Sequence, residues 1–502
     1  MKKFFQDRKR FFYLVSPAII GGIYLILCFL NLNQSVNLAE SQNIYYTHFD
    51  FAKITEFSSA NAYPPLFLFA LKAWAHLCGN SIVTMCALSA IFGAIALVSA
   101  FLWLKYKYGS TVAILSTFMM SISPILIHFG QEISPVSMLM AIIFASTFFL
   151  QLAIDTGKKY WWVVYVALML AAMFTHYFAI FAFIAHFAYL AIIYREKVFK
   201  QKFIYVYLLP IIVFTLWVFA PNHSAYLATE LSTTSITNFW SQAIFYEQGS
   251  SVSNWLIIPN LIYTIIALFL MIRYRQKIKL LLCMIIIPVI GLILLSLPPM
   301  QSAFQSSLIA YAQVSINITT GAVLVLYGRE LFAKKRKRSK KLLLRHPEIA
   351  AIAVSIIVVV IPFFGLISVL NKGNYDLESG QKPTIAQVFG DILSLDRGEN
   401  LSIIATSPDI YYELSAYESY HHDVNFTDEL FEPDEVLKQT YFGHISDLDK
   451  FLETRDGIWL VGVTPDSDTI HFPRDNWRVA SIANMQYGDT STRYQILKLE
   501  KE

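Results

Sequence analysis

Eleven long apolar runs with almost no charge occupy most of residues 1–370 of this chain. A helix of about 17 to 25 apolar residues can cross the roughly 30 Å of hydrocarbon in a bilayer. Hydrophobic residues make up 56% and charged residues 15% of the chain, whereas a soluble globular protein carries about 25% charged residues. The sequence therefore predicts an α-helical polytopic membrane protein. The runs cover approximately residues 11–31, 82–104, 110–129, 135–154, 160–176, 178–194, 203–220, 255–272, 280–297, 307–327 and 348–370.

A twelfth apolar run, residues 64–78, is shorter and contains Lys72 and His76. Its length and its charges favour a helix that lies at the membrane interface over a helix that crosses the membrane. Counting it as a span would invert every later loop.

Basic residues are concentrated in alternate gaps between the runs. The N-terminus and the gaps on its side hold 26 of the 39 Lys and Arg residues, whereas the opposite side up to residue 370 holds only Lys53 and Lys72. Because basic loops stay in the cytoplasm, we expect a plasma-membrane, multi-pass protein with a cytoplasmic N-terminus. The first run lacks a convincing cleavage site, so we expect it to remain as an anchor.

The last 132 residues differ in composition from the rest. Residues 371–502 contain 24 acidic and 11 basic residues, and the topology makes them extracytoplasmic. Residues 401–405, 458–463, 477–482 and 493–499 have strand patterns, and 434–454 have helix-like spacing. We predict two domains: a membrane domain over 1–370, with a first outer loop at 32–63 and an interfacial helix at 64–78, and a small α/β domain over 371–502.

The net charge of +4 does not indicate a nucleic-acid partner. The basic cluster from Lys334 to Lys341 follows a predicted span, so it is better explained as a segment that faces lipid headgroups. We therefore expect membrane lipids as partners and no nucleic acid.

Acidic residues that face the outer side of the membrane domain are few. They are Glu40, Asp50, Glu56, Glu132, Glu230 and Glu247. A carboxylate inside a helix bundle at the membrane surface is costly to desolvate, which favours a functional or tightly paired role for Glu40 and Glu132. Hydrated residues at the interface are the alternative for both. We also expect Glu132 to pair with Gln131 and the first loop.

Four motifs occur in a characteristic order along the first 195 residues. Glu40 stands in the first outer loop, and Asn61-Ala62-Tyr63-Pro64-Pro65-Leu66-Phe67 follows about two dozen residues later. Ser123-Pro124 and Gln131-Glu132 bracket a corner, and Thr175-His176-Tyr177-Phe178 forms another. This order resembles the GT-C superfamily of polyprenyl-phosphate-sugar-dependent glycosyltransferases, which includes protein O-mannosyltransferases and aminoarabinose transferases.

The chain departs from the family pattern at several positions. Ala39 replaces the leading Asp of an Asp-Glu pair, Asn61 replaces an Asp before the prolines, Tyr63 replaces a His, and Ser134 replaces an Arg. These changes remove groups that would act as a base, a metal ligand or a phosphate-binding cation.

The resemblance implies transfer of a sugar from a polyprenyl-phosphate-linked donor to an envelope glycan, lipid or protein on the outer face. Such a reaction needs a base for the acceptor hydroxyl and positive groups for the departing phosphate. Glu40 is the candidate base, and the candidate phosphate-binding residues are Lys53, Lys72 and His176, with His48 and His128 as further donors. The candidate supporting residues are Asp50, Asn61, Gln131, Glu132 and Tyr177.

Simpler explanations exist for several of these residues. Lys72 could extend to headgroups, His176 could be a hydrogen-bonded interfacial residue, and Trp240, Phe245 and Tyr246 fit an aromatic belt as well as a sugar-binding surface. The sequence does not decide whether the reaction uses a metal ion, and a divalent cation is one alternative.

Two other functions remain open. The substituted motif positions fit a catalytically inactive GT-C-like protein that binds lipid or glycan. Secondary transport is weaker, because the runs lack a convincing ionisable residue near the membrane midplane.

Overall fold

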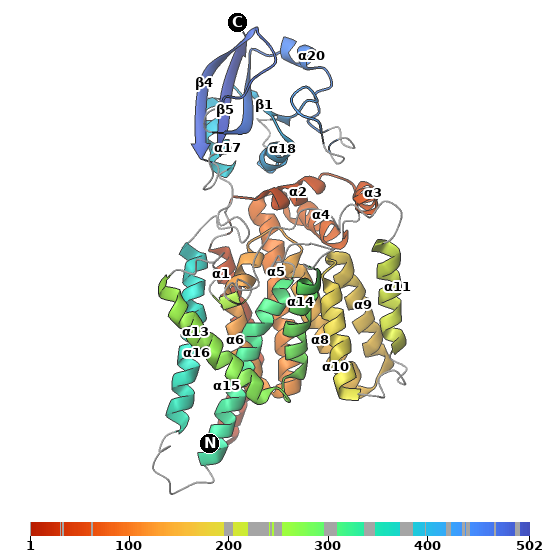
Figure 1. Cartoon of the computed structure of the whole chain (residues 1–502), viewed down its shortest axis with the longest axis vertical. Helices are drawn as coiled ribbons and strands as arrows, with labels where there is room; N and C mark the ends of the chain where they lie inside the picture. The colour runs from red at the N-terminus through yellow and green to blue at the C-terminus, as the bar shows by residue number, and fades with distance from the viewer. Residues whose placement is uncertain are drawn as a thin grey trace. The chain divides into compact units, whose positions relative to one another are not determined.

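The computed structural model divides the chain into two compact units (Figure 1). The first contains Met1–Leu32 and Ser58–Gly373, and the second contains Asn33–Phe57 and Asn374–Glu502. The first outer loop is thus grouped with the C-terminal residues. The structure describes residues 2–30, 32, 35–61, 64–194, 204–218, 240, 243–244, 254–295, 309–335, 347–371, 385–396, 398–417, 423–433, 437, 442–465, 468–486 and 492–501.

The first unit is helical, and each of the eleven predicted runs contains a helix. With no water in the hydrocarbon region, a helix is the structure that lets a single segment satisfy its own backbone hydrogen bonds. The helices are α1 (Lys2–Phe29), α4 (Leu66–Cys78), α5 (Ile82–Tyr108), α6 (Ser110–Ser121), α7 (Pro124–Gly130), α8 (Val136–Thr156), α9 (Lys159–Thr175), α10 (Ala179–Tyr194), α11 (Ile204–Val218), α13 (Asn254–Tyr274), α14 (Lys279–Leu295), α15 (Ala310–Lys335) and α16 (Pro347–Asn371).

Several helices of this unit are long enough to span a membrane. Within the described residues, four reach that length and apolarity: Ile82–Tyr108, Val136–Thr156, Ile257–Tyr274 and Ala310–Leu331. The bent pair α6 and α7 is a fifth candidate, and seven shorter apolar helices accompany them. The polytopic helical architecture is confirmed, while eleven crossings stay a prediction. The predicted interfacial segment 64–78 is helical as α4.

The run 110–129, predicted as one helix, is broken in two. Helices α6 and α7 meet at an angle of 61°. Pro124 cannot donate a backbone hydrogen bond and disfavours helical geometry in the residue before it, and Ser123 accordingly adopts an extended conformation. Asn317 of α15 donates from Nδ2 to Ser123 Oγ (3.0 Å) and accepts from Tyr263 OH at Oδ1 (3.1 Å), so buried polar groups are paired beside the break.

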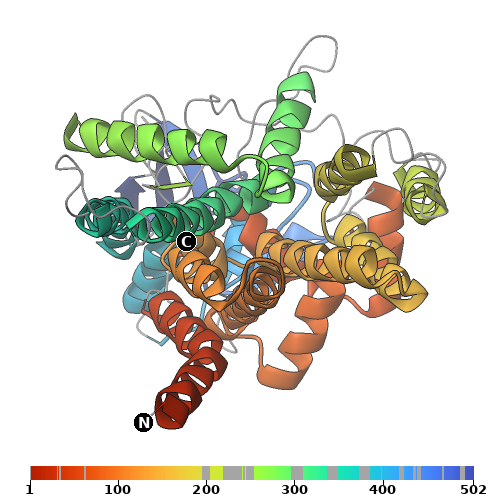
Figure 2. The ribbon, with the colours of Figure 1, turned by 90° about the horizontal axis from the view of Figure 1, so that it is seen from below.

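Figure 2 views the helical unit from the end at which the N-terminus lies. Three basic gaps meet in the described residues, because Tyr108 OH donates to Lys277 O (3.1 Å) and the Tyr108 carbonyl accepts from Arg329 Nη1 (3.2 Å). At the opposite end of α15, Tyr311 OH donates to Phe178 O (3.3 Å). These contacts place the gaps at Tyr108, Lys277 and Arg329 at one end and the gap at Phe178 at the other, as the charge pattern predicts, while the cytoplasmic location of the basic end stays a prediction.

Tyr24 of α1 fits into a space left by two glycines. Its OH donates to Leu126 O (3.3 Å), and the ring is fully buried. A Cβ added to Gly93 of α5 or Gly130 of α7 would overlap the Tyr24 hydroxyl. Close packing at these positions holds α5 and α7 against α1.

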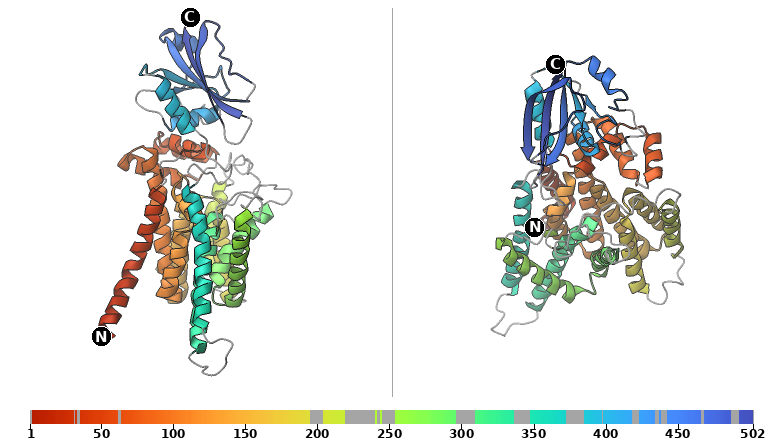
Figure 3. Two further views of the ribbon diagram at one scale, coloured as in Figure 1. Left: turned by 90° about the vertical axis from the view of Figure 1, so that its left-hand side faces the viewer. Right: turned by 45° about the horizontal axis from the view of Figure 1, so that its top comes forward.

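The second unit is built on a five-stranded mixed sheet with the order β2-β1-β3-β5-β4 (Figure 3). β1 pairs in parallel with β2 and β3, whereas β5 pairs antiparallel with β3 and β4. The predicted small C-terminal sheet is thus present. Its strands are β1 (Ser402–Ala405), β2 (Val424–Asn425), β3 (Gly457–Pro465), β4 (Trp477–Gln486) and β5 (Thr492–Lys501), and its helices include α2 (Leu38–Tyr46), α3 (Phe51–Asn61, which continues into the first unit), α17 (Ile385–Asp396), α18 (Pro408–Ser415) and α20 (Leu448–Glu453).

The helix expected over 434–454 is interrupted at residues 442–447 in the structure. Among the described residues of that range, Leu437 is helical, α20 begins at Leu448, and Gly443 between them has a left-handed φ of 64°. A Cβ at Gly443 would contact the carbonyl of Val424 at 2.5 Å. The close approach of the chain to β2 therefore replaces a helical turn, which the local spacing could not reveal.

Glu413 of α18 is an acidic residue buried in the second unit. Tyr494 of β5 donates its OH to Glu413 Oε2 (3.0 Å). Burial, opposed by the Tyr494 hydrogen bond and aided by nearby Asp409, raises the pKa of Glu413 to about 7.

Replacing Gly93 with Ala should destabilise the helical unit, because the new methyl group overlaps the Tyr24 hydroxyl. Overpacking of this kind typically costs about 1–3 kcal/mol. Thermal unfolding in detergent measures the effect, with Gly22→Ala as the control, since a Cβ at Gly22 meets nothing within 4 Å. Equal melting temperatures for the two variants would contradict the packing.

Glu413→Gln should stabilise the protein at pH 8 and leave it unchanged at pH 3.5. The folded-state pKa of Glu413 is raised, so its favourable contribution is complete below the unfolded value of about 4.5 and is lost as the pH rises through 7. Thermal unfolding of both proteins at the two pH values measures the difference. Glu453→Gln, which changes an exposed carboxylate, should show no such pH dependence.

Candidate functional site

Glu40 is fixed at the start of α2 by reciprocal hydrogen bonds with Asn37. Asn37 Oδ1 accepts from Glu40 N (2.9 Å), and Glu40 Oε2 accepts from Asn37 N (3.0 Å), which together form a capping box. A carboxylate in the first helical turn also interacts favourably with the helix dipole. Glu40 is 2% exposed, so its position is strongly determined.

Within the second unit, helix α2 packs against α18 through an aromatic cluster. Tyr45 packs with its ring 5.7 Å from that of Tyr411 and 5.1 Å from that of Tyr412, both on α18. Val36 N, just before α2, donates to Tyr417 OH (3.0 Å). The segment that carries Glu40 is therefore packed against the C-terminal residues of the same unit.

Asp50 and Lys53 lie together at the start of α3. Asp50 Oδ1 accepts from the backbone N of Lys53 (2.7 Å), so this carboxylate caps the first turn of the helix. Both side chains are exposed. Lys53 thus presents its ammonium group to the surroundings, and Asp50 has a local structural role.

Glu132 and Gln131 form a tightly bonded corner between α7 and α8. Glu132 Oε1 lies 2.9 Å from His128 Nε2, and both side chains are buried. Gln131 Nε2 donates to the carbonyl of Cys28 in α1 (3.0 Å). Glu132 thus pairs with His128, four residues earlier in the chain, instead of with the expected Gln131.

His176 and Tyr177 form the corner between α9 and α10. His176 ends α9, and its Nδ1 accepts from Phe178 N (3.3 Å). A ring nitrogen that accepts carries no proton, so the N–H of the neutral imidazole is at Nε2. Tyr177 is buried and packs edge-on against Phe214 of α11.

The remaining predicted positions are less closely defined. Lys72 is half-buried on α4, and Asn61 is the last residue of α3, with a side chain outside the described residues. Trp240 is half-buried, whereas Phe245 and Tyr246 lie outside the described residues.

The candidates form three local pairs, Asp50 with Lys53, Gln131 with Glu132, and His176 with Tyr177, and three separate residues, Glu40, Asn61 and Lys72. Glu40, Asp50 and Lys53 belong to the second unit, whereas the two corners, Asn61 and Lys72 belong to the first. Sequence reasoning missed the 2.9 Å pair of His128 with Glu132, although their spacing of four residues was a usable signal. Ser134, at the position of the family's Arg, has a buried Oγ with no hydrogen-bond partner among the described residues. Across the described residues, no group of three or more His, Cys, Asp or Glu side chains could hold a metal ion.

One family model and several solved structures are similar to the chain. The model of the dolichyl-phosphate-mannose-protein mannosyltransferase family matches residues 62–224. That segment contains the Pro64-Pro65 motif and both corners. No curated protein matches the chain in sequence.

Solved structures resemble the chain over nearly its whole length. ArnT from Cupriavidus metallidurans in the apo state has a TM-score of 0.60 at 11% identity, and 98% of each chain is covered. The same protein bound to undecaprenyl phosphate has a TM-score of 0.58 at 12% identity, with 97% of each chain covered. An oligosaccharyltransferase from Archaeoglobus fulgidus, tethered to an acceptor peptide, has a TM-score of 0.50 at 12% identity and covers 83% of this chain and 64% of its own.

ArnT and the archaeal enzyme are both GT-C glycosyltransferases. The resemblance to the GT-C superfamily of multi-pass membrane proteins is therefore confirmed, and at these identities it is the fold that is shared.

Removing the N-cap with Asn37→Ala should loosen α2. Loss of such a cap typically costs about 1 kcal/mol, which corresponds to roughly fivefold faster amide exchange over residues 38–46. Hydrogen exchange with mass spectrometry measures this rate. Asn37→Asp keeps an oxygen acceptor and should exchange like the wild type; equal acceleration in both variants would contradict the capping role.

Proposed function

We propose that the protein transfers a sugar from a polyprenyl-phosphate-linked donor to an envelope glycan, lipid or protein on the outer face of the membrane. The observation that carries the proposal is the likeness to ArnT over 98% of both chains, together with the retained Glu40 at the start of the first-loop helix. ArnT has been solved with undecaprenyl phosphate, which supports a lipid phosphate as the carrier here.

Glu40 is the proposed general base of this transfer. Its carboxylate takes the proton of the acceptor hydroxyl while the acceptor oxygen bonds to the anomeric carbon of the sugar. The bond between that carbon and the phosphate oxygen breaks, and the polyprenyl phosphate leaves with the bonding electrons. The capping box holds the carboxylate oxygen Oε2 in a defined direction, which favours a fixed reaction geometry.

Positive and hydrogen-bonding groups are proposed to stabilise the departing phosphate. Lys53 and Lys72 are the two Lys or Arg residues predicted on the outer side of the membrane domain. His176 accepts from Phe178 N at Nδ1, so its proposed role is to donate a hydrogen bond from Nε2 and not to supply a charge. Gln131, Glu132 and Tyr177 are proposed to keep the two corners in shape.

The second candidate function is a GT-C-like protein that binds lipid or glycan without catalysis. The burial of Glu40 favours it, because a 2% exposed carboxylate that caps a helix has a structural role of its own. Ala39 and Ser134 add to this, since both lack the charge of the family residue.

Glu40→Gln separates the two roles of this side chain. Gln at the third helical position still accepts the capping hydrogen bond, so the helix is kept while the base is lost. We expect transfer from a polyprenyl-phosphate sugar in membranes to fall about 10²–10⁴-fold, the usual contribution of a general base.

Glu56→Gln is the matched control, because Glu56 is an exposed acid of the same loop. It should retain full activity. Undiminished transfer by Glu40→Gln would remove Glu40 from the mechanism, and absence of transfer by the wild type would favour the binding protein.

A further inference from the structure

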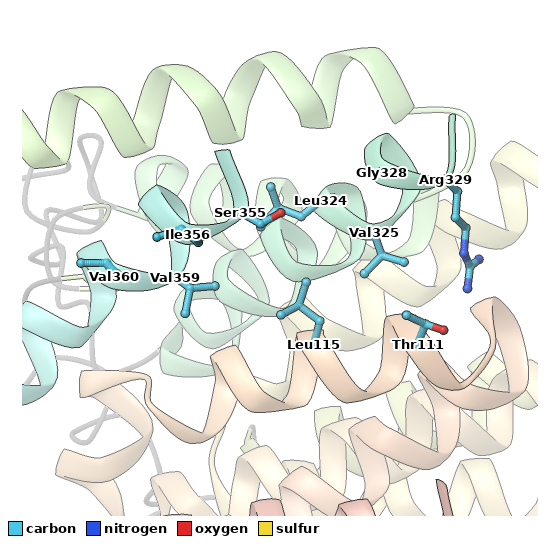
Figure 4. A pocket seen from close by; sticks show the side chains of 10 residues that line it. All are labelled: Thr111, Leu115, Leu324, Val325, Gly328, Arg329, Ser355, Ile356, Val359 and Val360. Carbon is cyan, nitrogen blue, oxygen red and sulfur yellow. The ribbon is translucent and has the colours of Figure 1, made fainter. Parts of the chain in front are cut away.

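An apolar groove lies at the basic end of the helical unit, between α6, α15 and α16 (Figure 4). Its volume is about 610 Å³, within the range of roughly 300–1,000 Å³ that is typical of ligand sites. It is lined by Thr111, Leu115, Leu324, Val325, Gly328, Arg329, Ser355, Ile356, Val359 and Val360.

The groove has one charged end. Arg329 extends beside Thr111 at that end, and aliphatic side chains line most of the rest (Figure 4). Arg329 donates from Nη1 to the carbonyl of Tyr108 (3.2 Å), and none of the described carboxylates pairs with it. A guanidinium carries five donors, so this one bond leaves it able to bind an anion.

The neighbouring acid is neutralised by other groups. Glu330 accepts from Arg273 Nη2 and from Tyr274 OH, each at 2.6 Å. The sequence of α15 ends in two further basic residues, Lys334 and Lys335. The electrostatics of this end therefore favour an anionic ligand.

We propose that this groove binds one anionic phospholipid, with an acyl chain against the aliphatic residues and the phosphate on Arg329. Basic pockets between membrane helices on the cytoplasmic side bind anionic headgroups, and the basic end is the cytoplasmic end under the charge rule. The site is separate from the outer corners and independent of the proposed transfer.

Gly328 provides a way to fill the groove. A Cβ at this position meets nothing within 4 Å, so Gly328→Leu places a larger side chain in open space. Arg329→Gln removes the charge and keeps hydrogen-bonding capacity. Arg275→Gln is the matched control, because Arg275 is an exposed cation in another gap at the same end and does not line the groove.

Titration of the delipidated full-length protein with phosphatidylglycerol, followed by native mass spectrometry, tests the proposal. Arg329→Gln should weaken retention of this lipid about fivefold, the contribution of one basic residue near an anionic membrane surface. Gly328→Leu should abolish retention at the groove, and Arg275→Gln should match the wild type. Melting temperatures without lipid establish that each variant is folded.

Three results would overturn the proposal. One is equal retention by Arg329→Gln and Arg275→Gln, and another is unchanged retention by Gly328→Leu. The third is wild-type binding of zwitterionic phosphatidylcholine, or of undecaprenyl phosphate, as tightly as phosphatidylglycerol. The last outcome would assign the groove to bulk lipid or to the carrier lipid.

Discussion

The absence of water from the hydrocarbon region determines how this chain is organised. Every backbone polar group there needs an internal partner, so the apolar runs become helices and polar chemistry moves to their ends. The break between α6 and α7 follows the same constraint, because Asn317 pairs with Ser123 beside it. The same constraint accounts for the two corners at 131–132 and 176–177, where most polar candidates of the helical unit are found.

The candidate base belongs to a different environment. Glu40 is held by Asn37 and lies on a helix that packs against α18 through Tyr45. The geometry of the first loop therefore depends on the C-terminal residues, which have no membrane-spanning role in the predicted topology. One role of the second unit is therefore to hold the helix that carries Glu40.

Periodicity and charge predicted much of the fold because they act locally and repeatedly. The apolar runs predicted the helices, and the alternate basic gaps predicted which ends of the helices lie together. Segments rich in β-branched residues, such as 458–463, predicted the strands. The helix break at Ser123 was missed although Pro124 was visible, and the turn at Gly443 depends on the approach of β2, which is distant in sequence.

The candidate site was predicted by residue type and not by contact. The motifs identified Glu40 and Glu132 by residue type, and the local spacings of Asn37 with Glu40 and of His128 with Glu132 were signals of contact that the sequence analysis did not use. The burial of these side chains could not be predicted in the same way, because it depends on packing between helices that no single segment encodes.

The most direct test of the account is a single-turnover measurement on purified wild-type protein in proteoliposomes that contain a polyprenyl-phosphate sugar and a candidate acceptor. The account predicts release of free polyprenyl phosphate in step with glycosylated acceptor. Tight binding of the lipid-linked sugar without any release of polyprenyl phosphate, across sugar and acceptor classes, would contradict it.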